Sequence, residues 1–386
     1  MKRLYFFIIA GLIILVLIGF WVYSFLYGSP SNEDSIFTNL GIFGQNNTEE
    51  IYTPPVLDEV PTVDVATEQL RQLTTKAVIG ARIVDNASTT VMRYVEAGTG
   101  HIFDIDLVTG QETRISNISI PAAEKAVVSP SGNYAAVRSG LGNEETVTLV
   151  DITTSDNPTS TKLPNQIRSF AFGYNNELLF TEISLGQTEG KGYLPSTAAT
   201  HRLFTAPFVA HEMAWSESSS TSHIIYTKPT ASMIGYAYEI TASGLKRFPY
   251  SGFGLTITQS GGVRFVGRQG DSGYGTIVIN RSGQVFESPG AIMPEKCVGG
   301  TGARDNQFCA SPFALTEPDF PDAWYKGRYV SNDNLWEISA GKGSLLVYPS
   351  HTIGRNFDVQ NLQMSEDDGM LYFINRIDNT LWLYEI

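Results

Sequence analysis

The segment Ser129-Pro-Ser-Gly-Asn-Tyr-Ala-Ala-Val137 joins a polar turn to a short apolar strand, and its strand recurs along the chain. The copies are Val91-Met-Arg-Tyr94, Tyr134-Ala-Ala-Val137, Glu177-Leu-Leu-Phe180, His223-Ile-Ile-Tyr226, Val263-Arg-Phe-Val266, Asn306-Gln-Phe-Cys309 and Met370-Leu-Tyr-Phe373. Five of the six intervals between their last residues are 40 to 46 residues long, and the sixth is 64. A repeat of about 40 to 50 residues built from short strands is typical of one four-stranded blade of a β-propeller.

The sequence around each copy fits the same unit. Polar turns such as Thr258-Gln-Ser-Gly-Gly262 precede several copies, and a third strand with a further turn follows, as in His101-Ile-Phe-Asp-Ile-Asp-Leu107 and Thr109-Gly110. Past the first 67 residues no long stretch shows the 3.6-residue period of a helix. We therefore predict an all-β domain over residues 68–386 with seven blades. Six or eight blades remain open, because residues 185–207 show no clear strand pattern.

The two ends of this domain are predicted to meet. The last copy is followed by only one strand, at residues 380–386, which leaves the final blade one strand short. An unpaired sheet edge invites aggregation. The segment Glu68-Gln-Leu-Arg-Gln-Leu-Thr74 has the character of an outer strand, so we expect it to pair with residues 380–386 and close the propeller.

The turns give the chain a family resemblance. Ser129-Pro-Ser-Gly132 and Ser365-Glu-Asp-Asp-Gly369 are similar to the Ser-Pro-Asp-Gly-type turn that opens the second strand of a blade in TolB-like, WD-type propellers. Thr380-Leu-Trp-Leu-Tyr384 resembles the third strand that follows. The resemblance covers about 300 residues and implies a bacterial envelope propeller, a statement about fold and not about function.

The first 27 residues are predicted to anchor the chain in a membrane. Residues 4–27 carry no charge, and 24 residues in a helix span about 36 Å, enough for a hydrocarbon core of roughly 30 Å. Lys2 and Arg3 precede this stretch, so the positive-inside bias predicts a cytoplasmic N-terminus and an extracytoplasmic propeller. A cleaved signal peptide is the alternative, although bulky residues from Tyr23 to Tyr27 stand where a peptidase needs small ones.

Residues 28–67 are predicted to form a flexible stalk. Polar residues alternate there with four prolines, at positions 30, 54, 55 and 61, and bury too little apolar surface to order the chain. A small apolar group, from Ile36 to Phe43, is either a short helix at the membrane surface or a sticky part of the stalk.

The two cysteines, Cys297 and Cys309, bracket a glycine-containing loop in the sixth blade. If the propeller lies outside the cytoplasm, oxidation is permitted there. We expect a disulfide that ties the first and second strands of that blade together. A free catalytic thiol is the alternative, but the sequence offers no convincing histidine partner.

The long sixth interval contains about 20 extra residues, roughly positions 312–332. Asp319, Asp322, Trp324 and Tyr325 within it are the predicted binding residues, because an aromatic pair beside carboxylates on a long loop suits recognition. We favour the other interpretation, in which Phe320, Trp324 and Tyr325 plug the edges of neighbouring blades.

Three motifs that suggest chemistry are incomplete. Gly270-Asp-Ser-Gly273 resembles a serine-protease motif, but no histidine has the expected context and a hairpin turn is due at this position. His211-Glu212 lacks a second histidine four residues on, where Trp215 stands. Asp104 and Asp106 share one face of a strand, which would suit a calcium site or a catalytic carboxylate pair, but exposed polar residues at alternate strand positions are commoner. We predict no catalytic residue, metal or cofactor, and expect that the protein is not an enzyme.

Net charge excludes one class of partner. The formal charge of −13 repels a densely charged polyanion such as DNA, so nucleic acid is not an expected partner. The favoured hypothesis is a membrane-tethered extracytoplasmic scaffold that binds an envelope protein or a cell-wall glycan. The alternative hypothesis is an extracytoplasmic glycan hydrolase or lyase that uses carboxylates at the mouth of the propeller channel.

Overall fold

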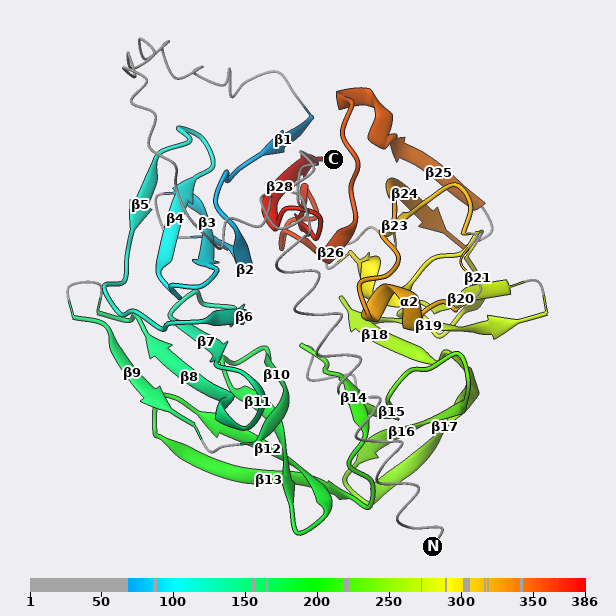
Figure 1. Ribbon diagram of the computed structural model, residues 1–386, viewed down its shortest axis with the longest axis horizontal. Helices are drawn as coiled ribbons and strands as arrows, with labels where there is room; N and C mark the ends of the chain where they lie inside the picture. Colours follow the sequence, from blue (N-terminus) through cyan, green and yellow to red (C-terminus); the bar gives the residue numbers. More distant parts are fainter. Residues whose placement is uncertain are drawn as a thin grey trace, which may run out of the picture. The chain divides into compact units, whose positions relative to one another are not determined.

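The computed structural model describes residues 69–386, apart from residues 86–88, 155–156, 164–165, 218–221, 272, 289, 301–305, 316, 318 and 341–342. These described residues form seven four-stranded antiparallel sheets, which are arranged as blades around an axis (Figure 1). The prediction of an all-β, seven-bladed propeller is confirmed, and the alternatives of six and eight blades are wrong.

In blades 1 to 6 the four strands follow one another in sequence, from the innermost strand outward. Blade 1 contains β2 (Val78–Asp85), β3 (Thr90–Glu96), β4 (Ile102–Asp106) and β5 (Glu112–Arg114). Blade 2 contains β6 (Ala123–Val128), β7 (Tyr134–Ser139), β8 (Thr146–Asp151) and β9 (Thr159–Lys162). Blade 3 contains β10 (Ile167–Phe172), β11 (Leu178–Ser184), β12 (Gln187–Leu194) and β13 (Ala199–Ala206).

The same order continues in the second half of the molecule. Blade 4 contains β14 (His211–Ala214), β15 (Ile224–Thr227), β16 (Ile234–Thr241) and β17 (Gly244–Phe253). Blade 5 contains β18 (Thr256–Ser260), β19 (Val263–Gly270), β20 (Gly273–Ile279) and β21 (Val285–Glu287). Blade 6 contains β22 (Cys297–Gly299), β23 (Gln307–Ser311), β24 (Asn334–Ser339) and β25 (Gly343–Tyr348). Blade 7 contains β26 (Val359–Met364), β27 (Met370–Asn375), β28 (Thr380–Glu385) and β1 (Leu70–Gln72).

Blade 7 is built from both ends of the propeller, as the sequence predicts. Strand β1 pairs antiparallel with β28, with Leu70 opposite Tyr384 and Gln72 opposite Trp382. Figure 1 shows the blue β1 beside the red β28. Leu70 is only 1% exposed, because it packs into the apolar seam between blades 6 and 7. This strand therefore closes the propeller and contributes to its core.

The recurring polar turn connects neighbouring blades. The hydroxyl oxygen of Ser129 accepts a hydrogen bond from the backbone N–H of Tyr134 at 3.0 Å, which holds the turn between β6 and β7. Gly132 has φ +75°, and a Cβ there would lie 2.8 Å from the side chain of Val84 in blade 1. Arg93 of blade 1 donates to the carbonyl of Gly132 at 2.7 Å. Glycine is thus required by both the backbone conformation and the close packing.

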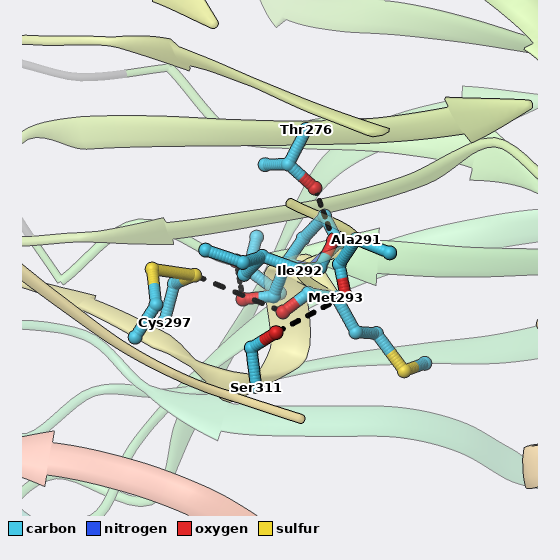
Figure 2. The surroundings of a disulfide bond; sticks show 9 residues. Thr276, Ala291, Ile292, Met293, Cys297 and Ser311 are labelled. Carbon is cyan, nitrogen blue, oxygen red and sulfur yellow. Dashed lines mark hydrogen bonds between the residues drawn. A yellow bond between two sulfur atoms is a disulfide. The ribbon is translucent and has the colours of Figure 1, made fainter. Parts of the chain in front are cut away.

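The disulfide between Cys297 and Cys309 is present, as predicted (Figure 2). The two cysteines face each other across the β22–β23 pair. Both are buried in a cluster that joins blades 5 and 6. The bond therefore links the innermost strand of blade 6 to the next strand, beside the axis.

Removing this bond is expected to destabilise the propeller. For the double variant Cys297→Ala/Cys309→Ala, we expect the free energy of unfolding to fall by about 2 to 3 kcal/mol, from the closure entropy of a short loop. Denaturant unfolding of the variant and the oxidised wild type measures the difference. An unchanged unfolding midpoint would contradict the expected stabilisation.

The predicted membrane anchor (residues 1–27) and stalk (residues 28–67) lie outside the described residues. Among the residues that the structure does describe, no helix combines the length and the apolar character needed to cross a membrane. The anchor, the stalk and the extracytoplasmic location stay predictions.

Candidate active site

The repeated strand order gives the propeller two distinct faces. Because each blade begins with its innermost strand, these strands all begin on one face and end on the other. We call the face where the innermost strands begin the strand-start face, and the face where they end the strand-end face. Charged side chains near the axis differ between the two faces.

Three charged residues converge at the strand-start face. Lys125 lies on β6, Glu212 lies on β14, and Glu295 lies in the 3-10 helix η3 (Pro294–Lys296) directly before β22. These positions belong to blades 2, 4 and 6, yet Glu212 and Lys125 both influence the pKa of Glu295. The three side chains therefore lie within range of one another's charge near the axis. Together with Tyr325, they form what we call the axial cluster.

Hydrogen bonds from two blades fix the segment that carries Glu295. Thr276 of blade 5 donates to the carbonyl of Ile292, and Ser311 of blade 6 donates to the carbonyl of Ala291 at 3.3 Å (Figure 2). Thr258 of blade 5 donates to the carbonyl of Pro294 at 2.7 Å. The disulfide follows immediately at Cys297. Glu295 is therefore held on a segment whose backbone is fixed on both sides.

The Glu295 carboxyl group has an unusual environment. The Tyr325 hydroxyl donates a hydrogen bond to Oε1 at 2.6 Å. The other oxygen, Oε2, is buried and has no hydrogen-bond partner in the described part of the chain. Burial raises the pKa of Glu295 from its ordinary value of 4.5 to about 7, although the bond from Tyr325 acts in the opposite direction. This carboxyl group exchanges its proton near neutral pH.

The other two charged groups of the cluster are also shifted. Burial raises the pKa of Glu212, against the influence of Lys125. Burial, assisted by the nearby Arg138, lowers the pKa of Lys125. The Lys125 side chain is exposed to solvent, yet the surrounding protein restricts the hydration of its ammonium group enough to lower its pKa. A carboxyl group and an amine with pKa values moved toward neutrality are suited to acid–base catalysis.

The long insertion of blade 6 brings Tyr325 to the cluster. Its short helix α2 (Asp322–Tyr325) is held by Trp324, whose indole N–H donates to Asp358 Oδ1 at 2.8 Å. The Lys296 ammonium group lies 2.5 Å from Asp333 Oδ2 and 2.7 Å from Asp358 Oδ1. Arg376 Nη1 lies 2.8 Å from Asp358 Oδ2. We call Lys296, Asp333, Asp358, Trp324 and Arg376 the Lys296 network. Two adjacent residues of η3 thus contact the insertion. Lys296 binds the Asp358 carboxylate that holds Trp324, and Glu295 accepts the hydrogen bond from Tyr325.

The four predicted binding residues have different roles in the structure. Trp324 is 7% exposed and packs with Phe320, which agrees with the plug alternative. Asp322 Oδ2 accepts a hydrogen bond from the backbone N–H of Ala231 in blade 4 at 2.5 Å. Asp319 pairs with Arg328 at 3.3 Å near the surface, and Tyr325 binds Glu295 as described. A ligand-binding role for these four residues stays a prediction.

The incomplete motifs occupy structural positions. The ring nitrogens of His211 lie 3.0 Å from Thr181 Oγ1 and 3.1 Å from Thr188 Oγ1. Asp104 forms two hydrogen bonds with Arg93, at 2.6 and 2.7 Å. Asp106 accepts hydrogen bonds from the backbone N–H groups of the following turn. Within the described residues, no group of three or more His, Cys, Asp and Glu side chains is placed to hold a metal ion.

The hairpin predicted at Gly270 is also observed. Gly270 and Gly273 pair at the end of the β19–β20 hairpin. Ser272 lies outside the described residues.

Sequence reasoning missed Lys125, Glu212 and Glu295. It considered Glu212 only as part of a zinc motif, and it gave no attention to the other two. A usable signal was present, since each charged residue lies in or directly before a strand that has to face the axis. A charge at such a position is costly unless it has a partner or a function.

Comparisons with known proteins identify the fold. No protein-family model and no curated protein matches the sequence. The propeller is similar to virginiamycin B lyase from Staphylococcus aureus, with a TM-score of 0.54 and 14% identity over 82% of this chain and 98% of that one. Oligogalacturonate lyase from Vibrio parahaemolyticus gives a TM-score of 0.57 and 8% identity, with 82% and 93% of the two chains covered. The propeller domain of the Trilobed protease from Pyrococcus furiosus gives 0.51 and 9% identity, with 81% and 94% covered.

These comparisons correct the expectation that the protein is not an enzyme. That expectation depended partly on the lack of a second domain to carry an active site. Two of the similar structures are lyases, and the aligned propeller covers 98% and 93% of their chains. A propeller of this architecture therefore needs no large second domain for catalysis. The TolB-like resemblance and the bacterial envelope assignment are not supported by these comparisons and stay predictions.

Proposed function

We propose that this protein is a lyase that cleaves an acidic glycan by β-elimination at the axial cluster. The observation that carries the proposal is the Glu295 carboxyl group, which receives the Tyr325 hydroxyl at 2.6 Å while its buried second oxygen has no partner in the described residues. Lys125 and Glu212 from two other blades lie near it. Perturbed groups that converge in this way are typical of active sites.

The reaction assigns one role to each group. The neutral amine of Lys125 takes the proton from the carbon next to a sugar carboxylate. The electron pair of that C–H bond forms a C=C bond, and the glycosidic C–O bond on the next carbon breaks. The protonated Glu295 gives its proton to the leaving oxygen. The shifted pKa values favour this pairing, because burial acts to lower that of Lys125 and to raise that of Glu295.

Tyr325 is a positioning residue in this proposal. Its hydroxyl fixes the orientation of the Glu295 carboxyl group, and α2 holds the tyrosine itself. The predicted membrane anchor and stalk would hold the enzyme on the outer side of the cytoplasmic membrane, where cell-wall or environmental glycans are accessible.

A substrate survey tests the proposal. Full-length protein is incubated with polygalacturonate, alginate, hyaluronan and, because of the structural similarity, virginiamycin B. Elimination produces a conjugated C=C bond whose ultraviolet absorbance rises with time, and we expect this signal for an acidic glycan. New reducing ends without that absorbance would show hydrolysis and contradict elimination. Cleavage of virginiamycin B alone would contradict the assignment of a glycan substrate.

The variant Tyr325→Phe is expected to change the pH dependence of the reaction. The tyrosine hydrogen bond acts to lower the pKa of Glu295, so its loss raises that pKa above about 7. Because the protonated carboxyl group is the active form, the fall in kcat at alkaline pH should move to higher pH. A pH profile of kcat measures this shift.

Tyr236→Phe serves as the control, since this tyrosine lies on β16 and its side chain is partly exposed. The control profile should match the wild type. Coincident profiles for Tyr325→Phe and the wild type would remove Tyr325 from the site.

A further inference from the structure

A large cavity lies on the strand-end face, at the opposite end of the innermost strands from the axial cluster. Its volume is about 870 Å³, within the range of small-molecule binding sites. Each of the seven blades contributes at least one described residue to its wall. The proposed elimination reaction uses none of these residues.

The charged residues in the wall balance one another. Arg82 and Arg281 provide two positive charges, and Glu217 and Glu366 provide two negative charges. The formal net charge of the whole chain is −13. The described lining of the cavity is therefore neutral in a strongly acidic protein, which disfavours ligands with a large charge of either sign.

The arginines orient their neighbours. Arg82 Nη1 lies 3.4 Å from Glu217 Oε1. Burial alone would lower the pKa of Arg82, but Glu217, with a smaller contribution from Glu366, raises it. Arg281 donates from Nε to the carbonyl of Gly261 at 2.5 Å. The guanidinium groups thus hold carboxylate and backbone groups in place at the cavity wall.

Aromatic and amide groups complete the wall. Tyr174, in the turn between β10 and β11, is 62% exposed, so its ring is accessible to a ligand. Tyr372 donates its hydroxyl hydrogen to Gln363 Oε1 at 2.6 Å, which fixes the orientation of that amide. The cavity therefore combines an exposed aromatic ring with fixed groups that donate and groups that accept hydrogen bonds.

We propose that this cavity binds a neutral oligosaccharide. Tyr174 packs against the apolar face of a sugar ring, and the Glu217 and Glu366 carboxylates accept hydrogen bonds from its hydroxyl groups. Hydroxyl groups both donate and accept, so they match a wall that offers both kinds of partner without net charge. An anionic ligand meets two carboxylates, and a cationic ligand meets two guanidinium groups. The inference is independent of the proposed lyase activity.

Calorimetric titration with neutral hexasaccharides tests the proposal. Maltohexaose, cellohexaose and chitin hexasaccharide are titrated into the full-length protein, and we expect at least one to bind. The variant Tyr174→Ala should raise the Kd of that ligand about tenfold, through the loss of the aromatic contact. Tyr174 is largely exposed, so the variant is expected to fold. The partly exposed Tyr236 on blade 4 gives the control Tyr236→Ala, which should bind like the wild type.

The variant Glu366→Gln distinguishes the classes of ligand. It should weaken the binding of a neutral oligosaccharide several-fold, because a carboxylate is the stronger hydrogen-bond acceptor. The same variant should strengthen the binding of an anionic ligand, because it removes a repulsive charge. Preferential binding of a galacturonate hexasaccharide that strengthens in Glu366→Gln would overturn the proposal. Absence of binding by all three neutral ligands would overturn it as well.

The two proposals fail separately. Repeating the titration with the variant Glu295→Gln should give an unchanged Kd, since Glu295 belongs to the opposite face. Binding without any glycan cleavage would support the cavity and reject the lyase. Cleavage without binding of neutral oligosaccharides would do the reverse.

Discussion

Replacing Glu295 by glutamine is expected to lower kcat for the elimination reaction by about 10²- to 10⁴-fold, the usual contribution of general acid–base catalysis. Glutamine keeps the size of the side chain and still accepts the hydrogen bond from Tyr325, which in the wild type is 2.6 Å long. It has no proton to give to the leaving oxygen. The loss should therefore appear in kcat, with little change in KM.

A surface carboxylate provides the matched control. Glu287 lies exposed at the end of β21, on the outermost strand of blade 5, so Glu287→Gln makes the same chemical change away from the axis. It should retain wild-type kcat. A Glu295→Gln variant with undiminished kcat on a confirmed substrate would remove Glu295 from the reaction.

The same variant has a consequence that does not depend on knowing the substrate. The pKa of Glu295 is raised from 4.5 to about 7, so the folded protein binds more protons than the unfolded chain between these values. Stability contributed by this group therefore falls as the pH rises through that window. Glu295→Gln should remove this fall. The difference in free energy of unfolding between variant and wild type should therefore shift in favour of the variant as the pH rises from 4.5 to about 7. Denaturant unfolding across this range measures the difference.

Replacing Lys296 by methionine is expected to lower the free energy of unfolding by about 3 to 5 kcal/mol, the typical cost of removing one partner from a buried ion pair. The Lys296 side chain is 3% exposed, and its ammonium group faces Asp333 and Asp358 at 2.5 and 2.7 Å. Methionine fills similar space but leaves the buried Asp333 carboxylate without its cation, while Asp358 keeps only Arg376, at 2.8 Å. Denaturant unfolding at neutral pH measures the loss.

The pH dependence of that loss identifies its cause. Without Lys296, the Asp333 carboxylate can avoid an uncompensated buried charge by binding a proton. The destabilisation of Lys296→Met should therefore become smaller as the pH falls. A loss that stays constant with pH would indicate altered packing rather than exposed charge.

Lys326→Met is the matched control in the same insertion. Lys326 also pairs with an aspartate, Asp322 at 3.1 Å, but its side chain is 60% exposed. An exposed ion pair contributes about 0 to 1 kcal/mol, so this variant should unfold almost like the wild type. Equal effects of the two substitutions would show that burial of the Lys296 network is unimportant.

The fold could be predicted because its determinants are local and repeated. The fixed spacing reveals the seven recurring strands and the turns beside them. It also shows that only one strand follows the last copy, which leads directly to the pairing of residues 70–72 with β28. The disulfide followed from two cysteines at the ends of one short loop. Each of these inferences needs only the periodicity of one blade.

The candidate site could not be predicted in the same way. Lys125, Glu212 and Glu295 come from blades 2, 4 and 6, and 170 positions separate the first residue from the last. Their proximity depends on how seven blades are placed around an axis, which no local pattern encodes. The burial that raises the pKa of Glu295 is likewise a property of the assembled propeller and of the insertion that covers it.

The pairing of β1 with β28 also constrains when this protein can finish folding. The backbone N–H of Leu381 donates to the Thr74 hydroxyl oxygen at 3.0 Å, across a separation of 307 residues. During synthesis, the segment that contains Leu70 is made long before its partner strand β28. A nascent chain that has not yet reached β28 leaves Leu70 and the edge of blade 7 uncovered. Such products are expected substrates for chaperones and proteases.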